Sequence, residues 1–286
     1  MSSLEPATLA LLRRAAARVP PPRVRALHLP PARPEDPLAG AWCALELDDG
    51  TLGLGYVLYG DTLPALRERA AGMAGVAGAD ALALAEGFAA APDDAQGVPR
   101  TLGFAAVHAL SHWLFRCAGW APPPAADSMG GIVPARGEAI GMIGLFESLL
   151  PRLAEAGAEV VVVELRTELH GARAGATVTG DPAALARCTQ VLATGTLVLN
   201  GTLERMRAAC PAARRFVLVG PSAGMLPDAL FACGVTHLGG VWITDPAAYL
   251  RGMAGGGRRG EAARKFTLAA EDYPGAEALI ERMAGG

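Results

Sequence analysis

The sequence predicts an α/β protein in which a doubly wound parallel-sheet domain follows a smaller α+β domain. In the second half of the chain, apolar strand-like runs alternate with helix-like segments, which is typical of a parallel sheet. Two of these runs, 160–163 and 216–219, are apolar at every position, as expected for strands covered on both faces. In the first half the strand-like segments come first and the helices follow, which indicates an α+β arrangement.

The first half, residues 1–120, is predicted to form the α+β domain. An apolar stripe predicts a helix over residues 7–18. Strands are expected over 24–29, 41–47 and 52–58, and helices over 63–70, 79–89 and 101–117. Asp48-Asp49-Gly50 is a hairpin signal between the second and third strands. Residues 121–138 form the predicted linker, because the run of three prolines after Ala121 cannot continue a helix.

The second half, residues 139–286, is predicted to form a compact doubly wound unit of about five strands. Its strands are expected over 139–143, 159–165, 190–193, 216–219 and 237–243. The helical segments between and after them are expected over 146–156, 182–187, 202–209, 226–233 and 246–253.

Composition narrows the class of protein. A chain of 286 residues with 51% hydrophobic and 19% charged residues has the balance of a well-buried globular protein. The net charge of −3 and the dispersed basic residues argue against nucleic acid as a partner. We expect no membrane span and no signal peptide, because no apolar run is long enough and the N-terminus lacks a basic and then an apolar region. Five cysteines without a CxxC pair predict reduced thiols and a cytoplasmic location. A surface rich in Ala and Leu is compatible with a homodimer.

The most informative stretch lies between the strand at 190–193 and the helix at 203–209. It is a loop of glycines, threonines and an asparagine, which leaves backbone N–H groups at a helix N-terminus, where anions are favoured. Helix capping would explain Asn200 or Thr202 alone. Capping does not require the whole set, so we expect these residues to bind a ligand: Thr194, Gly195, Thr196, Asn200, Gly201 and Thr202.

Similar turns recur after other predicted strands, at residues 141–144, 220–222 and 244–246. The carboxyl ends of parallel strands meet at one edge of a sheet, so these turns predict a shared ligand cleft. Asp245 and Pro246 also fit a plain helix start. No GxSxG elbow surrounds Ser222, which makes a nucleophilic role unlikely for it. The further ligand-binding candidates at these turns are Gly144, Phe146, Gly220, Pro221 and Ser222.

Glu164 raises the alternative of a nucleotide cofactor. It closes the predicted strand at 159–165, twenty positions after Gly144, where a dinucleotide fold holds a ribose. The glycine fingerprint is incomplete, and Leu145, Phe146 and Glu147 place bulk and negative charge where a pyrophosphate would lie. An ordinary strand-to-helix turn explains the same residues. Glu164 is therefore a ligand-binding candidate, and an enzyme that acts on a carboxylate metabolite with a nucleotide is the alternative function.

Histidines supply the metal-binding candidates. His108 and His112 lie four apart on a predicted helix and can share one face, but no glutamate follows His108 as in HExxH. The pair is either a core pair or a metal pair. His237 lies in an apolar strand shortly after Cys233 and is either structural or a ligand. We name His108 and His237 as the metal candidates.

Several of these segments, in this order, resemble the heavy-metal chelation family called domain of unknown function 364, with its N-terminal partner domain 4213. The resemblance implies an enolase-N-terminal-like domain, then a Rossmann-like domain, with a cleft between them that binds metals or metal-bearing small molecules. The family usually has Asn at His108 and a Pro near Glu147 and Ser148. The matching segments span residues 102–110, 140–146, 194–202, 218–222 with 226–227, and 240–246.

These observations together predict a two-domain protein that binds a small anionic ligand in the interdomain cleft. The ligand would be an organic anion, a transition metal or a metal chelate. Hydroxyls and amides are weak ligands for soft metals, so we expect the carboxylates of a chelate to be recognised more than a bare metal.

Overall fold

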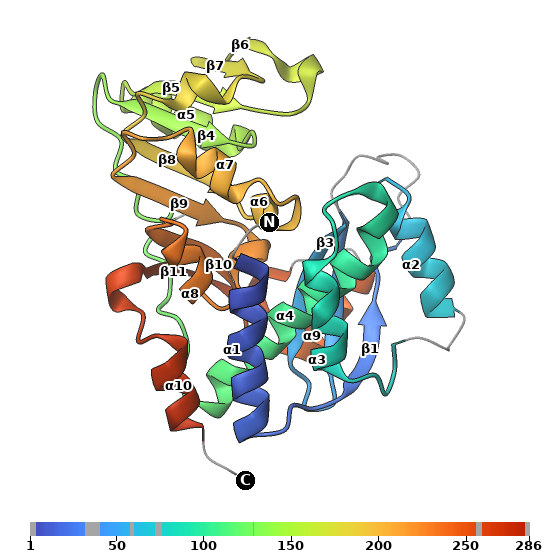
Figure 1. Cartoon of the computed structure of the whole chain (residues 1–286). Helices are drawn as coiled ribbons and strands as arrows, with labels where there is room; N and C mark the ends of the chain where they lie inside the picture. Colours follow the sequence, from blue (N-terminus) through green and yellow to red (C-terminus); the bar gives the residue numbers. More distant parts are fainter. Residues whose placement is uncertain are drawn as a thin grey trace.

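The computed structural model contains two sheets that are joined by a buried helix (Figure 1). It describes residues 4–31, 41–57, 60–71, 76–127, 129–255 and 259–283. Within these ranges no helix has the length and apolar character that crossing a bilayer requires. Leu58, at the end of a predicted strand, lies outside the described residues.

The N-terminal sheet is a three-stranded antiparallel meander in the order β1-β2-β3. Its strands are β1 (Val24–His28), β2 (Ala41–Leu47) and β3 (Leu52–Val57), which confirms the three predicted strands in this half. Gly50 has a φ of +81° in the turn between β2 and β3, and the Asp49 carboxylate accepts hydrogen bonds from the backbone and hydroxyl of Thr51. The predicted hairpin is therefore confirmed.

Helix α4 (Gly97–Cys117) lies against one face of this sheet and is buried over most of its length. Glycines in β3 allow the close approach. A Cβ atom on Gly53 would lie 2.1 Å from the carbonyl oxygen of Ala105, and one on Gly55 would lie 2.9 Å from the sulfur of Cys43. Because Leu and Gly alternate in β3, Gly53 and Gly55 lie on the face that contacts α4, and Leu52 and Leu54 lie on the opposite face.

The remaining N-terminal helices surround α4. They are α1 (Leu4–Arg18), α2 (Thr62–Ala71), α3 (Ala81–Ala85) and the short 3-10 helices η1 (Glu86–Ala89) and η2 (Asp94–Gln96). Asp80 starts α3, because its carboxylate accepts from the backbone N–H groups of Leu82 and Ala83. Helix α1 also contacts α8 (Asp228–Ala232) and α10 (Ala276–Arg282) of the C-terminal half, so the hydrophobic core is continuous between the two halves.

The second sheet has eight strands in the order β11-β10-β9-β8-β4-β5-β7-β6, and it is mostly parallel. This arrangement is consistent with a Rossmann-like domain. Its strands are β4 (Ala139–Ile143), β5 (Glu159–Val163), β6 (Gly171–Arg173), β7 (Ala176–Thr179), β8 (Gln190–Thr194), β9 (Arg215–Val219), β10 (His237–Ile243) and β11 (Ala263–Ala269).

The helices of this half are short. The α-helices are α5 (Leu150–Glu155), α6 (Thr196–Leu199), α7 (Leu203–Ala208), α8 (Asp228–Ala232), α9 (Pro246–Gly255) and α10 (Ala276–Arg282). The 3-10 helices are η3 (Glu147–Leu149), η4 (Thr167–Leu169), η5 (Pro182–Leu185), η6 (Pro221–Ala223), η7 (Arg259–Glu261) and η8 (Ala270–Asp272). Asp245 caps α9 through the Ala248 N–H at 2.9 Å, with Pro246 in its first turn, as the plain helix start predicts.

The prediction of about five strands was too low. The five predicted strands are present, and β6, β7 and β11 extend the sheet on both sides. Strands β6 and β7 are short and contain mainly small residues, and β11 carries the charged residues Arg264 and Lys265. None of the three therefore has the apolar run that marks a buried strand. The stretch at 194–202 also differs from the predicted continuous loop, because α6 forms inside it.

The two halves are also joined on the outer face of the N-terminal sheet. Leu52 and Leu54 of β3 pack against Tyr249 and Met253 of α9 in a separate apolar cluster. The N-terminal sheet is thus covered by α4 on one face and by a helix from the C-terminal half on the other. This packing fixes the orientation of the N-terminal sheet relative to the carboxyl edge of the large sheet.

Candidate functional site

The candidate site lies at the carboxyl edge of the parallel strands. Among the strands of this sheet, β4 comes first along the chain and lies inside the sheet, between β5 and β8. Strands β5 to β7 are added on one side of β4, and β8 to β11 are added on the other side, so the strand order reverses between β4 and β8. Open α/β sheets bind ligands outside the carboxyl ends of the strands at such a switch point. Figure 1 shows the arrowhead of β9 directed toward the side on which the N-terminal sheet lies.

The predicted turns interlock along this edge. A Cβ atom on Gly144 would lie 3.1 Å from the Thr194 side chain, so the turns after β4 and β8 touch. A Cβ atom on Gly195 would lie 3.0 Å from both the Ser222 side chain and the Ala223 nitrogen, so the turns after β8 and β9 touch. Gly144 has a φ of +81° and Gly220 one of +116°, values that favour glycine. The structure therefore brings three of the predicted turns together.

Glu164 extends this row to the end of β5. Its carboxylate accepts a hydrogen bond from the Leu145 N–H at 3.0 Å and one from the Arg166 N–H at 3.1 Å. Burial raises the pKa of Glu164, but these hydrogen bonds and the Arg166 guanidinium outweigh it, and the net pKa is lowered. Glu164 is thus an ionised side chain that holds the β4 turn in place.

The hydroxyls of Thr194 and Thr196 lie 3.1 Å apart and are half-buried at the end of β8. Phe146 is also half-buried, and its N–H donates to the sulfur of Met142 at 3.2 Å. Pro221 and Ser222 begin η6, where Ser222 is buried and Pro221 is partly exposed. These side chains, with the glycines beside them, line the edge that the sequence predicted as a cleft.

Asn200, Gly201 and Thr202 are separated from this edge by helix α6. The Asn200 amide oxygen accepts hydrogen bonds from the Thr202 N–H at 3.1 Å and the Thr202 hydroxyl at 2.5 Å, so it shapes the turn before α7. Gly201 packs on Pro92 of the N-terminal half. The structure does not bring these three residues together with the other turns.

Helix α4 supports the turns from behind through buried polar side chains. The Arg100 guanidinium donates to the carbonyls of Val198 and Leu199 at the end of α6, and also to Glu5 and to the carbonyls of Phe88 and Ala90. A cation at the C-terminal end of a helix bonds the carbonyl groups that lack partners within the helix and interacts favourably with the helix dipole. Sequence reasoning missed Arg100, and its signal was a charged residue in the first turns of a helix that is mainly apolar.

His108 holds the turn after β9. Its Nε2 atom lies 3.1 Å from the carbonyl oxygen of Ser222, and the Ser111 hydroxyl accepts from the Leu226 N–H at 3.0 Å. Burial and the neighbouring His112 lower the pKa of His108 to about 3, and the bond to Ser222 opposes the shift. The ring is 1% exposed. His108 thus reaches the edge only through the backbone of η6.

His112 lies one turn further along α4, with its ring centroid 6.2 Å from that of His108 and 4.9 Å from that of Trp242. Burial lowers its pKa to about 4, although the backbones of Gly224 and Leu52 approach the ring and oppose the shift. Among the described residues no hydrogen bond of good geometry reaches its Nε2 atom. Both rings are neutral and lie among aromatic neighbours, so His108 and His112 form a core histidine pair rather than a pair open to a metal.

His237 lies at the opposite edge of the sheet, at the start of β10. Its Nε2 atom accepts from the Arg215 guanidinium at 3.0 Å, and its Nδ1 atom lies 3.0 Å from the Thr236 hydroxyl. Burial and then Arg215 lower its pKa. Both ring nitrogens therefore have partners in the protein, and His237 does not meet His108 or the glycine turns.

A bare metal ion does not fit the described residues. No three His, Cys, Asp or Glu side chains among them lie close enough to ligate one ion. The carboxylates at the carboxyl edge are separately engaged: Glu164 accepts from two backbone N–H groups, Glu147 lies 3.9 Å from Arg173, and Asp245 caps α9. The other polar groups of the turns are hydroxyls and glycine backbone. This donor set suits an organic anion better than a soft metal.

The N-terminal sheet contributes an aromatic wall that sequence reasoning missed. Trp42 of β2 and Tyr56 of β3 are directly paired across the strands, with ring centroids 4.9 Å apart. Burial raises the pKa of Tyr56, and the charges of Arg166 and Glu164 also act on it. Tyr56 therefore lies within electrostatic range of the charged residues that follow β5. The chain has four tryptophans and four tyrosines, and the rarity of these side chains was the signal in the sequence that could have drawn attention to Trp42 and Tyr56.

Comparison with known proteins agrees with this fold. A family model for domain of unknown function 364, described as "Putative heavy-metal chelation", matches residues 132–270. Among curated proteins no sequence matches this chain. A protein of unknown function from the same family in Desulfitobacterium hafniense is 19% identical with a TM-score of 0.64, over 92% of this chain and 98% of its own. One from Pyrococcus horikoshii is 20% identical with a TM-score of 0.60, over 92% and 99%. These likenesses show a shared fold across both halves.

Proposed function

We propose that this chain, which matches the model of the heavy-metal chelation family over residues 132–270, binds a small organic anion, free or as a metal chelate, at the carboxyl edge of the large sheet. The ligand would lie between the turns after β4, β8 and β9 and the N-terminal sheet. In keeping with the predicted architecture, we treat the N-terminal unit as enolase-N-terminal-like.

The interlocking of the three turns at the switch point is the observation that carries this proposal. Gly144 touches Thr194, and Gly195 touches Ser222, so a ligand at one turn would reach the others. Thr194 and Thr196 offer hydroxyl donors, and Arg166 offers a guanidinium that is 54% exposed. Hydroxyls and a guanidinium are donors that suit carboxylate oxygens.

The heavy-metal name of the family is best reconciled with this edge through a chelate. Since the described residues lack a cluster of metal ligands, a metal would arrive with its coordination sphere already filled by an organic acid. The protein would then contact the carboxylates of the chelate and not the ion. No chemistry of the metal itself is needed for this recognition.

A nucleotide-dependent enzyme remains the alternative, and it rests on the place of Glu164 at the end of β5. A ribose there would need the carboxylate that now holds the Leu145 and Arg166 N–H groups. A nucleotide would therefore have to share a carboxylate that already shapes the turn. The binding experiment below separates this alternative from the proposal by mass.

The proposal is tested by native mass spectrometry of the protein purified anaerobically without chelators, beside its Thr194→Val variant. We expect a discrete extra mass that matches an organic acid or its metal chelate, and a clear loss of that mass in Thr194→Val. Thr177→Val, an exposed substitution on β7, is the matched control and keeps the mass. A nucleotide mass would favour the enzyme. Retention of the acid in Thr194→Val would contradict the proposed position of the ligand.

A further inference from the structure

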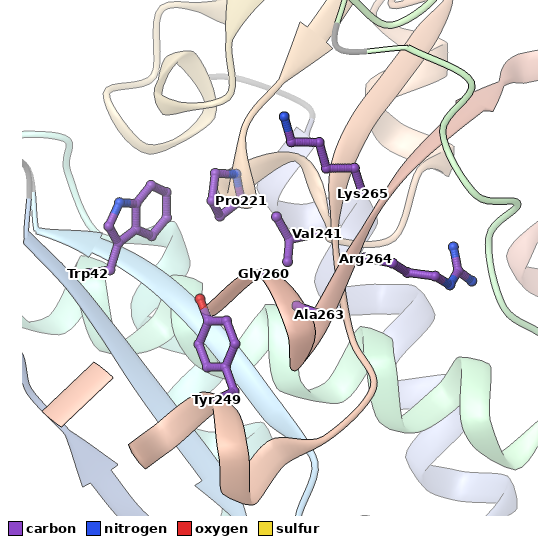
Figure 2. Close-up of a pocket in the computed structure, with 8 residues that line it drawn as sticks. All are labelled: Trp42, Pro221, Val241, Tyr249, Gly260, Ala263, Arg264 and Lys265. Carbon is purple, nitrogen blue, oxygen red and sulfur yellow. The ribbon is translucent and has the colours of Figure 1, made fainter. Parts of the chain in front are cut away.

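A cavity of about 260 Å³ lies where the two halves meet, beside the turn after β9 (Figure 2). Its walls come from five parts of the chain: β2, η6, α9, η7 and the β10–β11 ribbon. Only Pro221 among the predicted site residues lines it. The other residues that this inference uses are Trp42, Val241, Tyr249, Ala263 and Lys265.

The walls of the cavity are mainly apolar. Val241 and Lys265 are register partners on neighbouring strands, and Ala263 is two positions from Lys265, so all three share one face of the ribbon. Figure 2 shows Trp42, Pro221 and Tyr249 around the same opening, with the hydroxyl end of Tyr249 directed toward the space between the other two. Rings on three sides form a site for a flat apolar group.

The cation at this cavity is the only lysine in the chain. The other 24 of the 25 Lys and Arg residues are arginines, so Lys265 is the one basic position, apart from the histidines, at which the side chain is not a guanidinium. An ammonium is a compact point charge, whereas a guanidinium is a wide planar fork that would fill more of a small cavity. A lysine here leaves space for a ligand.

Lys265 is exposed and is not used by the fold as a charge. None of the ion pairs between described residues includes it. Its neighbour Arg264 also lines the cavity, but its guanidinium end lies away from Trp42 and Pro221 in Figure 2 and donates to the Pro122 carbonyl at 2.6 Å. Lys265 is therefore the cation that an anion in this cavity would meet.

We infer that this cavity binds the ring of an aromatic carboxylic acid, with the carboxylate paired to the Lys265 ammonium. The volume lies near the lower end of the range for ligand pockets, roughly 300–1,000 Å³, and so suits one or two rings. The inference deepens the proposed function and rests on it only through Pro221, which belongs both to the β9 turn and to this cavity. It names the aromatic acid as the ligand class.

The first test is calorimetric titration of the whole protein with 2-naphthoate, with 2-naphthalenemethanol as the neutral probe of similar shape. We expect the acid to bind and the alcohol to bind about five-fold more weakly, because a partly exposed ion pair contributes a modest preference. Lys265→Met should remove that preference while keeping the ring contacts. Arg251→Met, an exposed change on α9 outside the cavity lining, is the matched control and should bind the acid as the wild type does.

The single lysine permits a second, independent measurement. An amine-reactive acetylating reagent can modify only Lys265 and the chain's N-terminal amine, and peptide mass spectrometry separates the two. We expect 2-naphthoate to slow acetylation of Lys265 several-fold and to leave the N-terminal amine unchanged. The alcohol should protect Lys265 much less.

The two proposals can fail separately. Absence of 2-naphthoate binding at millimolar concentration, equal binding by Lys265→Met, or acetylation that the acid does not slow would overturn the inference. If Thr194→Val retains a co-purified acid but Lys265→Met loses 2-naphthoate, the proposed position at the glycine turns fails and the aromatic acid pocket stands. If both substitutions weaken the same ligand, one elongated ligand occupies both places.

Discussion

The two edges of the large sheet are built from different chemistry. At the amino edge, Glu138 before β4 accepts hydrogen bonds from the side chains of Thr189, Gln190 and Arg214. At the same edge, Arg215 at the start of β9 donates to His237 at the start of β10. At the carboxyl edge the turns after β8 and β9 consist of glycines, hydroxyls and a proline, and charged side chains lie at Glu147, Glu164 and Arg166. The strands thus begin at mutually hydrogen-bonded polar side chains, and β8 and β9 end in small residues.

This difference indicates where a ligand has room. Paired side chains at the amino edge satisfy one another and fill the space beyond the strands. The carboxyl edge is supported from behind instead, because Arg100, His108 and Ser111 of α4 bond the backbone of α6 and η6. Support from behind leaves the turns after β8 and β9 free of large side chains at Gly195, Gly220 and Ser222. We therefore expect substitutions at the amino edge to act on stability, and we propose that the ligand binds at the carboxyl edge.

Removal of the buried support should have the largest effect. In Arg100→Met, Glu5 loses its partner in a site where Arg100 is 1% exposed, and the carbonyls of α6 lose their donor. We expect the free energy of unfolding to fall by about 3–5 kcal/mol, because a buried charge and buried acceptors are left unpaired. Urea unfolding measures the change.

The matched control for this substitution is Arg13→Met. Arg13 also pairs with a glutamate, Glu86, but both side chains are about half exposed, at 51% and 46%. We expect a loss below about 1 kcal/mol for this surface pair. Equal effects of the two substitutions would show that α4 does not support the carboxyl edge as the contacts suggest.

The histidine pair on α4 should make the support sensitive to pH. The pKa values of His108 and His112 are lowered to about 3 and about 4, mainly by burial, whereas an unfolded histidine titrates near 6.5. The unfolded chain therefore takes up protons as the pH falls below about 6.5, and the folded chain does not. Stability is full above that pH and is lost toward pH 4.

We expect a loss on the order of 2 kcal/mol per histidine between pH 8 and pH 5, measured by urea unfolding at each pH. His108→Asn keeps an amide that can donate to the Ser222 carbonyl and removes one titrating group. Its stability should depend on pH about half as steeply over this range. A slope equal to that of the wild type would mean that His108 is not buried as a neutral ring.

Much of the fold could be predicted from the sequence because its signals are local. The continuous apolar runs of β5 and β9 and the Asp48–Gly50 turn depend on neighbours within a few residues. Strands β6 and β7 were missed, since these short segments form strands only by pairing, β7 with β5 and β6 with β7. Tertiary contact decides such segments, and local propensity does not.

The candidate site was predictable in part for the same reason. The glycines at 144, 195 and 220 mark the ends of their strands, and the parallel order brings those ends together. Trp42, Tyr249 and Lys265 come from three elements with no shared spacing, so no pattern in the sequence unites them. His237 shows the converse: a histidine in a strand was read as a candidate without regard to which end of the strand it occupies.

The smallest effect is expected at the amino edge, in His237→Gln. The substitution removes the ring that accepts from Arg215, but Arg215 keeps the Gly131 carbonyl at 2.8 Å, so its guanidinium is not left without a partner. We expect the free energy of unfolding to change by less than about 1 kcal/mol. Any co-purified ligand seen by native mass spectrometry should stay at the wild-type stoichiometry, because both ring nitrogens of His237 are engaged by Arg215 and Thr236 on the amino side of the β9 turn. Loss of that ligand without loss of stability would place binding at the amino edge and reverse the assignment of the two edges.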